Sequence, residues 1–182
     1  ALRESEERYR SIVETTTEWI WEMDTAGRHT FANPMISAIL GYSPSEIMEL
    51  EFSSLLHEED FAAVQEKLPQ LMAGRQGWQG WVLRWRHKDG SYRYLESNAR
   101  PILDGAGALL GFRGADRDIT DRIQHEEALR HSQALLQGVF EGTDDCIFVK
   151  DENGRYILYN GALRTFLERL LGDAFPADGI DG

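Results

Sequence analysis

The fold is decided by the stretch Trp81-Val82-Leu83-Arg84-Trp85-Arg86, which the connection Lys88-Asp89-Gly90-Ser91 joins to residues 92–99. The side chains on both sides of this connection follow a period of two, which is the period of a β-strand. A short polar connection with a glycine favours a tight turn, so the two runs predict a β-hairpin. A second glycine-rich connection leads to residues 109–116, which predict a third antiparallel strand.

Two more strands are expected near the start of the chain. Residues 19–23 and 28–32 flank the turn Asp24-Thr25-Ala26-Gly27, in which Gly27 is suited to a positive φ. Alternating aromatic residues such as Trp19 and Trp21 are more typical of a core than of a ligand pocket, although both interpretations stay open.

Three short helices are expected between the two groups of strands. The first opens at Asn33, a residue suited to capping, and ends at Gly41. The second begins after Ser43, and the third covers residues 58–72, where Pro69 bends or shortens it. The pattern predicts an α+β fold: a five-stranded antiparallel sheet with short helices on one face, flanked by amphipathic linker helices.

The chain starts to repeat itself at an offset of 127 residues, so that Ala1-Leu2-Arg3 returns as Ala128-Leu129-Arg130. About a dozen identities occur in roughly forty gap-free pairs, which indicates a true repeat. Other identical pairs are Glu14 with Glu141, Thr16 with Thr143, Ile20 with Ile147, Asp24 with Asp151, Gly27 with Gly154, Asn33 with Asn160 and Leu40 with Leu167.

The repeat predicts the domain organisation. We expect an N-terminal linker helix at 1–17, a complete domain at 18–118, a linker helix at 119–142 and the N-terminal part of a second, truncated domain at 143–182. The first helix carries Leu2, Tyr9 and Ile12 at heptad-like spacing. The second linker carries a thin apolar seam, which predicts a weak coiled coil and a homodimer through the linker helices. The apolar residues of the truncated domain should be exposed unless something covers them: Leu158, Leu163, Phe166, Leu167 and Leu170.

Composition narrows the range of partners and compartments. The net charge of −12 argues against nucleic acid and against an anionic membrane surface. The single cysteine, Cys146, excludes an internal disulfide and fits a reducing compartment; we expect it to be a small buried residue. No apolar run approaches the roughly 20 residues of a membrane span. We therefore expect a cytoplasmic fragment without a membrane segment, cut from a longer protein that could itself be membrane-anchored.

At this point the ordered motifs resemble the PAS domain family, in its Trp-x-Trp subfamily. The motifs are Trp19-Ile20-Trp21-Glu22-Met23-Asp24, Gly27-Arg28, Phe31-x-Asn33-Pro34, Leu40-Gly41-Tyr42, Arg86-x-Lys88-Asp89-Gly90-Ser91-Tyr92-Arg93 and Asp118-Ile119-Thr120-Asp121-Arg122. The resemblance implies a non-catalytic sensory and dimerisation module of a bacterial-type signalling protein. Its signal would pass through Asp118, Ile119 and Thr120 to an output domain, either a histidine kinase or a diguanylate cyclase or phosphodiesterase. The alternative is a ligand-free scaffold for protein–protein contacts.

The resemblance also implies a ligand pocket between the sheet and residues 33–71. The candidate ligand-binding residues are Trp21, Phe31, Met35, Ile39, Phe61, Val64, Leu83 and Asn98. A colourless metabolite, a non-covalent flavin, haem or no ligand at all stay open. Trp78, Trp81 and Trp85 could stack on a cofactor ring, but we expect the face that Trp81 and Trp85 share to cover the sheet or a partner.

Several chemical sites are not expected. The first domain lacks the cysteine that the flavin-adduct branch of the family uses, and His57 only precedes the helix that supplies the axial ligand in the haem-binding branch. The run His57-Glu58-Glu59-Asp60 resembles a metal site, but acidic residues at a helix start are better explained by the helix dipole. Likewise, His125 lacks the context of a phospho-acceptor, so we expect neither a metal nor a catalytic residue.

Overall fold

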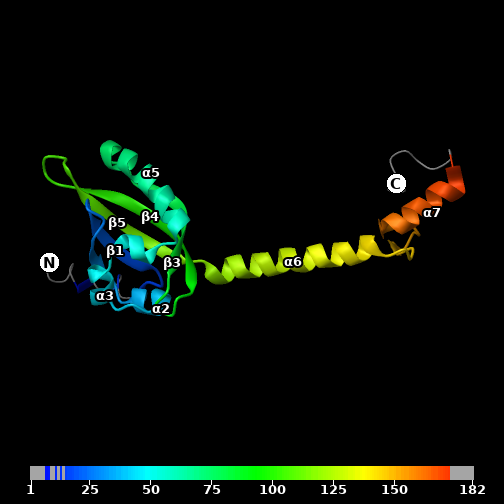
Figure 1. The fold of residues 1–182 in the computed structure, drawn as a ribbon, viewed down its shortest axis with the longest axis horizontal. Helices are drawn as coiled ribbons and strands as arrows, with labels where there is room; N and C mark the ends of the chain where they lie inside the picture. Colours follow the sequence, from blue (N-terminus) through cyan, green and yellow to red (C-terminus); the bar gives the residue numbers. More distant parts are fainter. Residues whose placement is uncertain (1–6, 9–10, 12, 14, 173–182) are drawn as a thin grey trace. The chain divides into compact units, whose positions relative to one another are not determined.

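The structure is a computed structural model that describes residues 7–8, 11, 13 and 15–172 (Figure 1). The chain separates into two compact units, Ala1–Ile123 and Gln124–Gly182. Leu2, Tyr9 and Ile12 of the expected N-terminal helix lie outside the described residues.

The first unit is built on a five-stranded sheet in the order β2-β1-β5-β4-β3, with every neighbouring pair antiparallel. The strands are β1 Trp19–Asp24, β2 His29–Ala32, β3 Trp78–Arg86, β4 Tyr92–Leu103 and β5 Leu109–Asp118. This confirms the predicted fold class. β3 begins before the predicted strand, and β4 and β5 continue past theirs.

Short helices cover one face of this sheet (Figure 1). They are α2 Met35–Leu40, α3 Pro44–Glu49, α4 Phe52–Leu55 and α5 Glu58–Gly74. Gly41 ends α2 with a left-handed φ of 78°, and Ser43 forms a capping box with Glu46 at the start of α3. Pro69 lies inside α5 without ending it.

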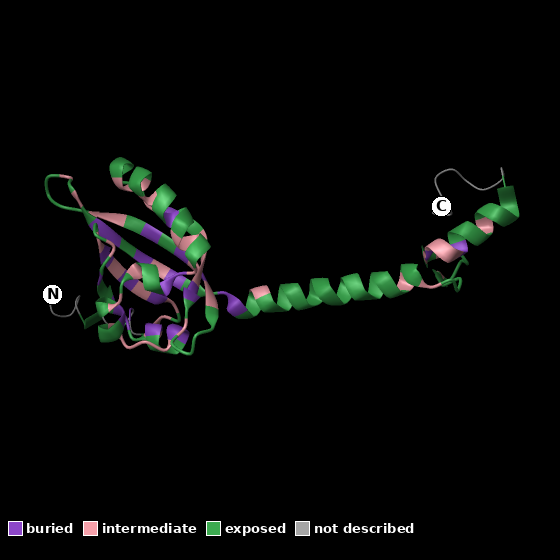
Figure 2. Cartoon of the chain, in the orientation of Figure 1, coloured by how far each residue is buried: buried purple, intermediate pink, exposed green. Residues whose placement is uncertain are grey.

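The core lies between this sheet face and the helices, where buried and exposed residues alternate along the strands (Figure 2). On β1, Trp19, Trp21 and Met23 are buried. Trp21 is paired with Gly114 of β5. A Cβ on Gly114 would lie 2.4 Å from Cζ2 of Trp21, so only glycine leaves room for the indole.

Asn33 differs from its predicted role as a helix cap, because Pro34 occupies that position and no side chain caps α2. The Asn33 side chain is buried and its Oδ1 accepts from the backbone N–H of Ile20 at 3.0 Å. Its Nδ2 donates to the carbonyls of Val13 and Glu18, both at 3.0 Å. Asn33 therefore fastens the chain before β1 to the chain after β2.

The continuous helix α6 Thr120–Gly142 begins in the first unit and continues into the second, which also contains β6 Phe148–Lys150, β7 Tyr156–Tyr159 and α7 Gly161–Leu171. Here Asn160 accepts from the N–H of Ile147 at 3.0 Å and donates to the carbonyls of Phe140 at 3.1 Å and Asp145 at 2.8 Å. All four positions are those of the Asn33 contacts shifted by 127 residues.

Burial in the second unit differs from our expectations at three residues. Cys146 is exposed, and Leu163 of α7 is buried, whereas Leu158, Phe166 and Leu170 are exposed as predicted. Leu167 is half-buried. No helix in the described part of the chain combines the length and the apolar character needed to cross a membrane.

Candidate ligand cavity and signal relay

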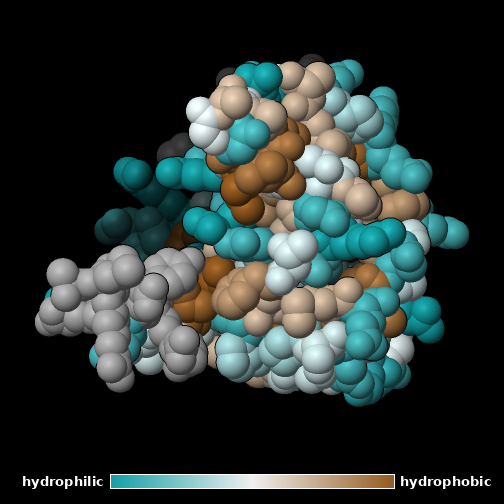
Figure 3. Space-filling model, turned by 90° about the vertical axis from the view of Figure 1, so that its left-hand side faces the viewer, coloured by the Kyte–Doolittle hydropathy of each residue, from teal (hydrophilic) through white to brown (hydrophobic). Residues whose placement is uncertain are grey.

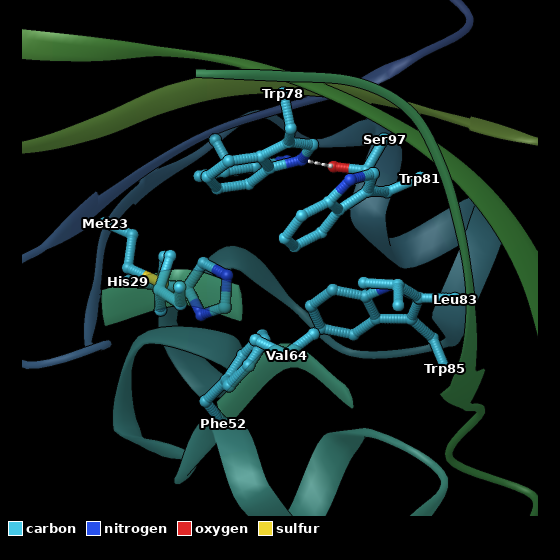
Figure 4. Close-up of a pocket in the computed structure, with 11 residues that line it drawn as sticks. Met23, His29, Phe52, Val64, Trp78, Trp81, Leu83, Trp85 and Ser97 are labelled. Atoms are coloured by element: carbon cyan, nitrogen blue, oxygen red, sulfur yellow. Dashed lines mark hydrogen bonds between the residues drawn. The ribbon is translucent and has the colours of Figure 1, made fainter. Parts of the chain in front are cut away.

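An aromatic cavity of about 20 Å³ lies between the sheet and the helices of the first unit. In Figure 4, Trp78 and Trp81 lie above this space, Phe52 and Val64 lie below it, and His29 lies at one side. The complete lining is Trp21, Met23, His29, Phe52, Val64, Leu68, Trp78, Trp81, Leu83, Trp85 and Ser97. The volume is about that of one water molecule.

His29 is surrounded by aromatic rings. Its ring centroid lies 5.3 Å from that of Trp19, 6.2 Å from those of Trp21 and Trp85, and 6.4 Å from that of Phe52. Burial lowers the pKa of His29 from 6.5 to about 4, so the imidazole is neutral at neutral pH. Its buried Nδ1 has no hydrogen-bond partner. No ionised side chain therefore lines the cavity at neutral pH.

Two of the cavity's indoles make hydrogen bonds into the sheet. Nε1 of Trp78 donates to the Ser97 hydroxyl at 3.0 Å, and Nε1 of Trp21 donates to Oδ1 of Asp116 at 2.8 Å. Asp116 lies on β5 and is fully buried, and its Oδ2 has no partner. Burial raises the pKa of Asp116 from 3.8 to about 6, although Ser97 and Trp21 act in the opposite direction.

The structure brings three of the predicted ligand-binding residues to this cavity: Trp21, Val64 and Leu83. Phe31, Met35, Ile39, Phe61 and Asn98 do not line it. Asn98 is exposed, and its Oδ1 accepts from the N–H of Gly80. Ile39, Met35 and Phe61 belong to the surrounding core.

A β-bulge explains why His29 replaces Phe31 in the lining. The pairing of β1 with β2 shifts between Glu22 and Met23, so Glu22 faces Phe31 and Met23 faces His29. The simple alternation of β2 is broken, and Phe31 is 37% exposed while His29 is 5% exposed. The sequence carries no clear sign of this bulge.

The shared face of Trp81, Leu83 and Trp85 turns inward. We expected this face to cover the sheet or a partner, and in the structure its three side chains pack on the core side of the sheet and line the cavity. The period of two identified the shared face, but it could not decide which side of the sheet it lies on. Met23, Phe52, Leu68 and Ser97 were not predicted at all.

Helix α5, which forms one side of the cavity, is joined to β3 by hydrogen bonds and an ion pair. Asp60 of α5 accepts from the backbone N–H of Arg84 at 2.6 Å and pairs with the Arg84 guanidinium at 2.7 Å. The space is too small for a haem or an isoalloxazine ring, because ligand pockets measure about 300 to 1,000 Å³. A larger ligand requires α5 and β3 to separate.

The residues of the suspected metal motif have other partners. Nδ1 of His57 accepts from the N–H of Glu59 at 3.3 Å, and Glu59 and Asp60 both bind Arg84. Within the described residues, no three His, Cys, Asp or Glu side chains are grouped as a metal site requires.

The predicted relay residues connect β5 to α6. Oδ1 of Asp118 accepts from the backbone N–H of Thr120 at 2.9 Å and from its hydroxyl at 2.5 Å. The same hydroxyl accepts from the N–H of Tyr94 in β4 at 2.9 Å, and the N–H of Ile119 donates to the Tyr94 carbonyl at 2.9 Å. The start of α6 is therefore hydrogen-bonded to β4, near the N-terminal end of that strand.

This arrangement agrees with a comparison of the sequence to known families, in which the PAS fold matches residues 7–119. The chain belongs to the PAS family. A PAS domain is a sensory module that is generally non-catalytic.

Two relatives illustrate the proteins in which similar PAS sequences occur. The nitrogen fixation regulatory protein of Klebsiella pneumoniae is 25% identical over 86% of this chain and 31% of its own length. The virulence sensor protein BvgS of Bordetella pertussis is 27% identical over 81% of this chain and 12% of its own length. The chain thus spans about a third or less of these curated relatives.

Solved structures agree on the fold. A sensory box histidine kinase/response regulator from Burkholderia thailandensis is 26% identical, with a TM-score of 0.55 over 71% of this chain and 98% of that one. A PAS domain from Colwellia psychrerythraea is 22% identical, with a TM-score of 0.58 over 64% of this chain and 98% of that one. The N-terminal domain of a diguanylate cyclase with a PAS/PAC sensor, from Marinobacter aquaeolei, has a TM-score of 0.52 at 21% identity and covers 59% of this chain and 98% of that one.

Proposed function

We propose that this chain is the sensory input and dimerisation module of a larger cytoplasmic or membrane-anchored signalling protein. A small uncharged ligand in the aromatic cavity changes the state of the sheet, and Asp118, Ile119 and Thr120 pass the change to α6. The output is a histidine kinase or a cyclic-dinucleotide enzyme. The second unit is the beginning of another copy of the same domain.

The observation that supports this proposal is the pair of hydrogen bonds between Tyr94 of β4 and the start of α6. Tyr94 precedes Leu95 and Ser97 on the same strand, and Ser97 forms part of the cavity wall. A displacement of the wall therefore has a short path to the first turn of α6. The path becomes a signal only if the ligand binds one of two states better.

Mass spectrometry of the purified protein under native conditions tests for the ligand. We expect a bound small molecule in the wild type and its loss in Val64→Phe, because the larger ring fills the cavity. Ala62→Phe adds the same ring at an exposed position of α5 and serves as the matched control.

If the wild type carries no bound small molecule even after incubation with metabolites from a cell extract, the result contradicts the sensory proposal and favours the ligand-free scaffold. Equal loss of the ligand in both variants shows that the cavity is not its site.

Dimerisation through α6 is a separate test. Leu129 and Leu136 are seven residues apart and 60% and 68% exposed, so they lie on one unpartnered face of the helix. We expect Leu129→Glu with Leu136→Glu to convert a dimer into a monomer by light scattering. Gln124→Glu with Ala134→Glu adds two negative charges to the opposite face and should leave the dimer intact. A monomeric wild type at high concentration contradicts this part of the proposal.

A further inference from the structure

Asp116 is a buried carboxyl without a cationic partner. It is fully buried on the central strand β5, and its Oδ1 accepts a hydrogen bond from the Trp21 indole at 2.8 Å. A buried polar group that relies on so few partners is sensitive to the position of each one. The charged residue that acts on it is Glu18, which raises its pKa further.

The surroundings of Asp116 join two parts of the molecule. Its neighbours across the strands are Trp19 on β1 and Ser97 on β4. Through Trp21 it touches the cavity, and Asp118 follows two residues later on the same face of β5. The Asp118 carboxylate accepts a hydrogen bond from the Thr120 hydroxyl, and that hydroxyl accepts one from the backbone N–H of Tyr94.

We infer that the Trp21–Asp116 hydrogen bond connects the cavity to the start of α6, with Asp116 as a positioning residue for both Trp21 and the end of β5. This inference rests on the proposed sensory function and names the residue that couples its two sites. A ligand that displaces the Trp21 indole removes one donor, the indole N–H, from the buried carboxyl. The carboxyl then finds another donor or takes up a proton, and either change moves β5 next to Asp118.

Trp21→Phe tests this connection because it removes the indole N–H and retains an aromatic ring. Trp19→Phe is the matched control: Trp19 lies on the same strand, is equally buried and has an Nε1 without a partner. The readout is amide hydrogen exchange of Tyr94, Ile119 and Thr120 by NMR on the full chain without added ligand. We expect about tenfold faster exchange in Trp21→Phe and no more than about a twofold change in Trp19→Phe.

A second pair keeps the test decisive if Trp21→Phe does not fold. Asp116→Asn retains an oxygen acceptor for Trp21, whereas Asp116→Leu retains a similar volume without an acceptor. We expect wild-type exchange in Asp116→Asn and accelerated exchange in Asp116→Leu.

Equal exchange in the members of either pair overturns the inference. The readout needs no ligand, so the absence of a bound molecule in the mass spectrum contradicts the proposed sensory function and leaves this result unaffected. Conversely, if a ligand binds but amide exchange is the same in both members of a pair, the sensory proposal stands and Asp116 does not couple the cavity to α6.

Discussion

The first and second units share one pattern of asparagine hydrogen bonds and differ in the strands that pack beside it. Asn33 and Asn160 are both buried and bind the same backbone positions at an offset of 127 residues. Phe148 occupies the position of Trp21 in this offset, yet Phe148 is 46% exposed and Trp21 is 4% exposed. The difference is the strand beside them, because β1 is paired with β5 whereas β6 is paired with β7 alone.

This comparison separates local from long-range contributions to the domain. The asparagine contacts, the aspartate turns at Asp24 and Asp151 and the left-handed glycines Gly27 and Gly154 need only about 25 residues of chain. Burial of the strand face needs the later strands, which add most of the apolar contacts. In the second unit, whose described sheet has only β6 and β7, apolar side chains such as Ile157 and Leu158 are exposed.

Figure 3 shows one face of the molecule coloured by hydropathy. Its apolar side chains form separate small patches between hydrophilic ones. That distribution is normal for a folded domain that has buried its core.

Replacement of the two asparagines gives the largest expected effect. Asn33→Ala removes three hydrogen bonds of a buried side chain and should lower the free energy of unfolding by about 4 kcal/mol. All five tryptophans lie between residues 19 and 85, so tryptophan fluorescence during urea unfolding reports only on the first unit.

Asn160→Ala is the matched control for this measurement. It should leave the fluorescence transition unchanged and accelerate amide exchange around β6 and β7. A shift of the fluorescence midpoint in Asn160→Ala as large as in Asn33→Ala would show that the two units unfold together.

Buried titratable groups give a smaller effect that is confined to the first unit. Asp116 holds its proton more tightly when folded, with a pKa of about 6 against 3.8, so its contribution to stability falls as pH rises between these values. His29 behaves oppositely: its folded pKa is about 4 against 6.5, so its contribution rises over that window. Each amounts to about 3 kcal/mol at most, and the two oppose each other between pH 4 and pH 6.

Asp116→Asn should therefore make the free energy of unfolding rise with pH more steeply than in the wild type. His29→Phe should do the reverse and expose the falling contribution of Asp116. Urea unfolding at several pH values between 4 and 6.5 measures both slopes. Variants with the wild-type slope would show that neither group titrates in this window.

Local patterns were sufficient to predict the strands and several helix boundaries. The end of α2 at Gly41 and the start of α3 after Ser43 are examples, because their signals lie within a few residues of the structure they form. The role of Asn33 could not be predicted in this way. Its partners at Val13 and Glu18 come close only after the chain has folded.

The candidate site was predicted less completely for the same reason. Trp21, Val64 and Leu83 were found, but His29 reaches the cavity through the bulge opposite Glu22 and Met23. Asn98 was expected in the cavity and lies on another surface, because alternation along β4 does not say which of its faces meets the helices. These choices depend on how strands pair far along the chain.

The close approach of Trp21 to Gly114 has a consequence for engineering this domain. The indole and the backbone carbonyl of Asn98 both occupy the volume that a side chain at position 114 would need, so this position accepts only glycine. A library that varies position 114 would return mainly misfolded members. Position 21, with Gly114 retained, is the natural starting point for reshaping the cavity to a chosen compound.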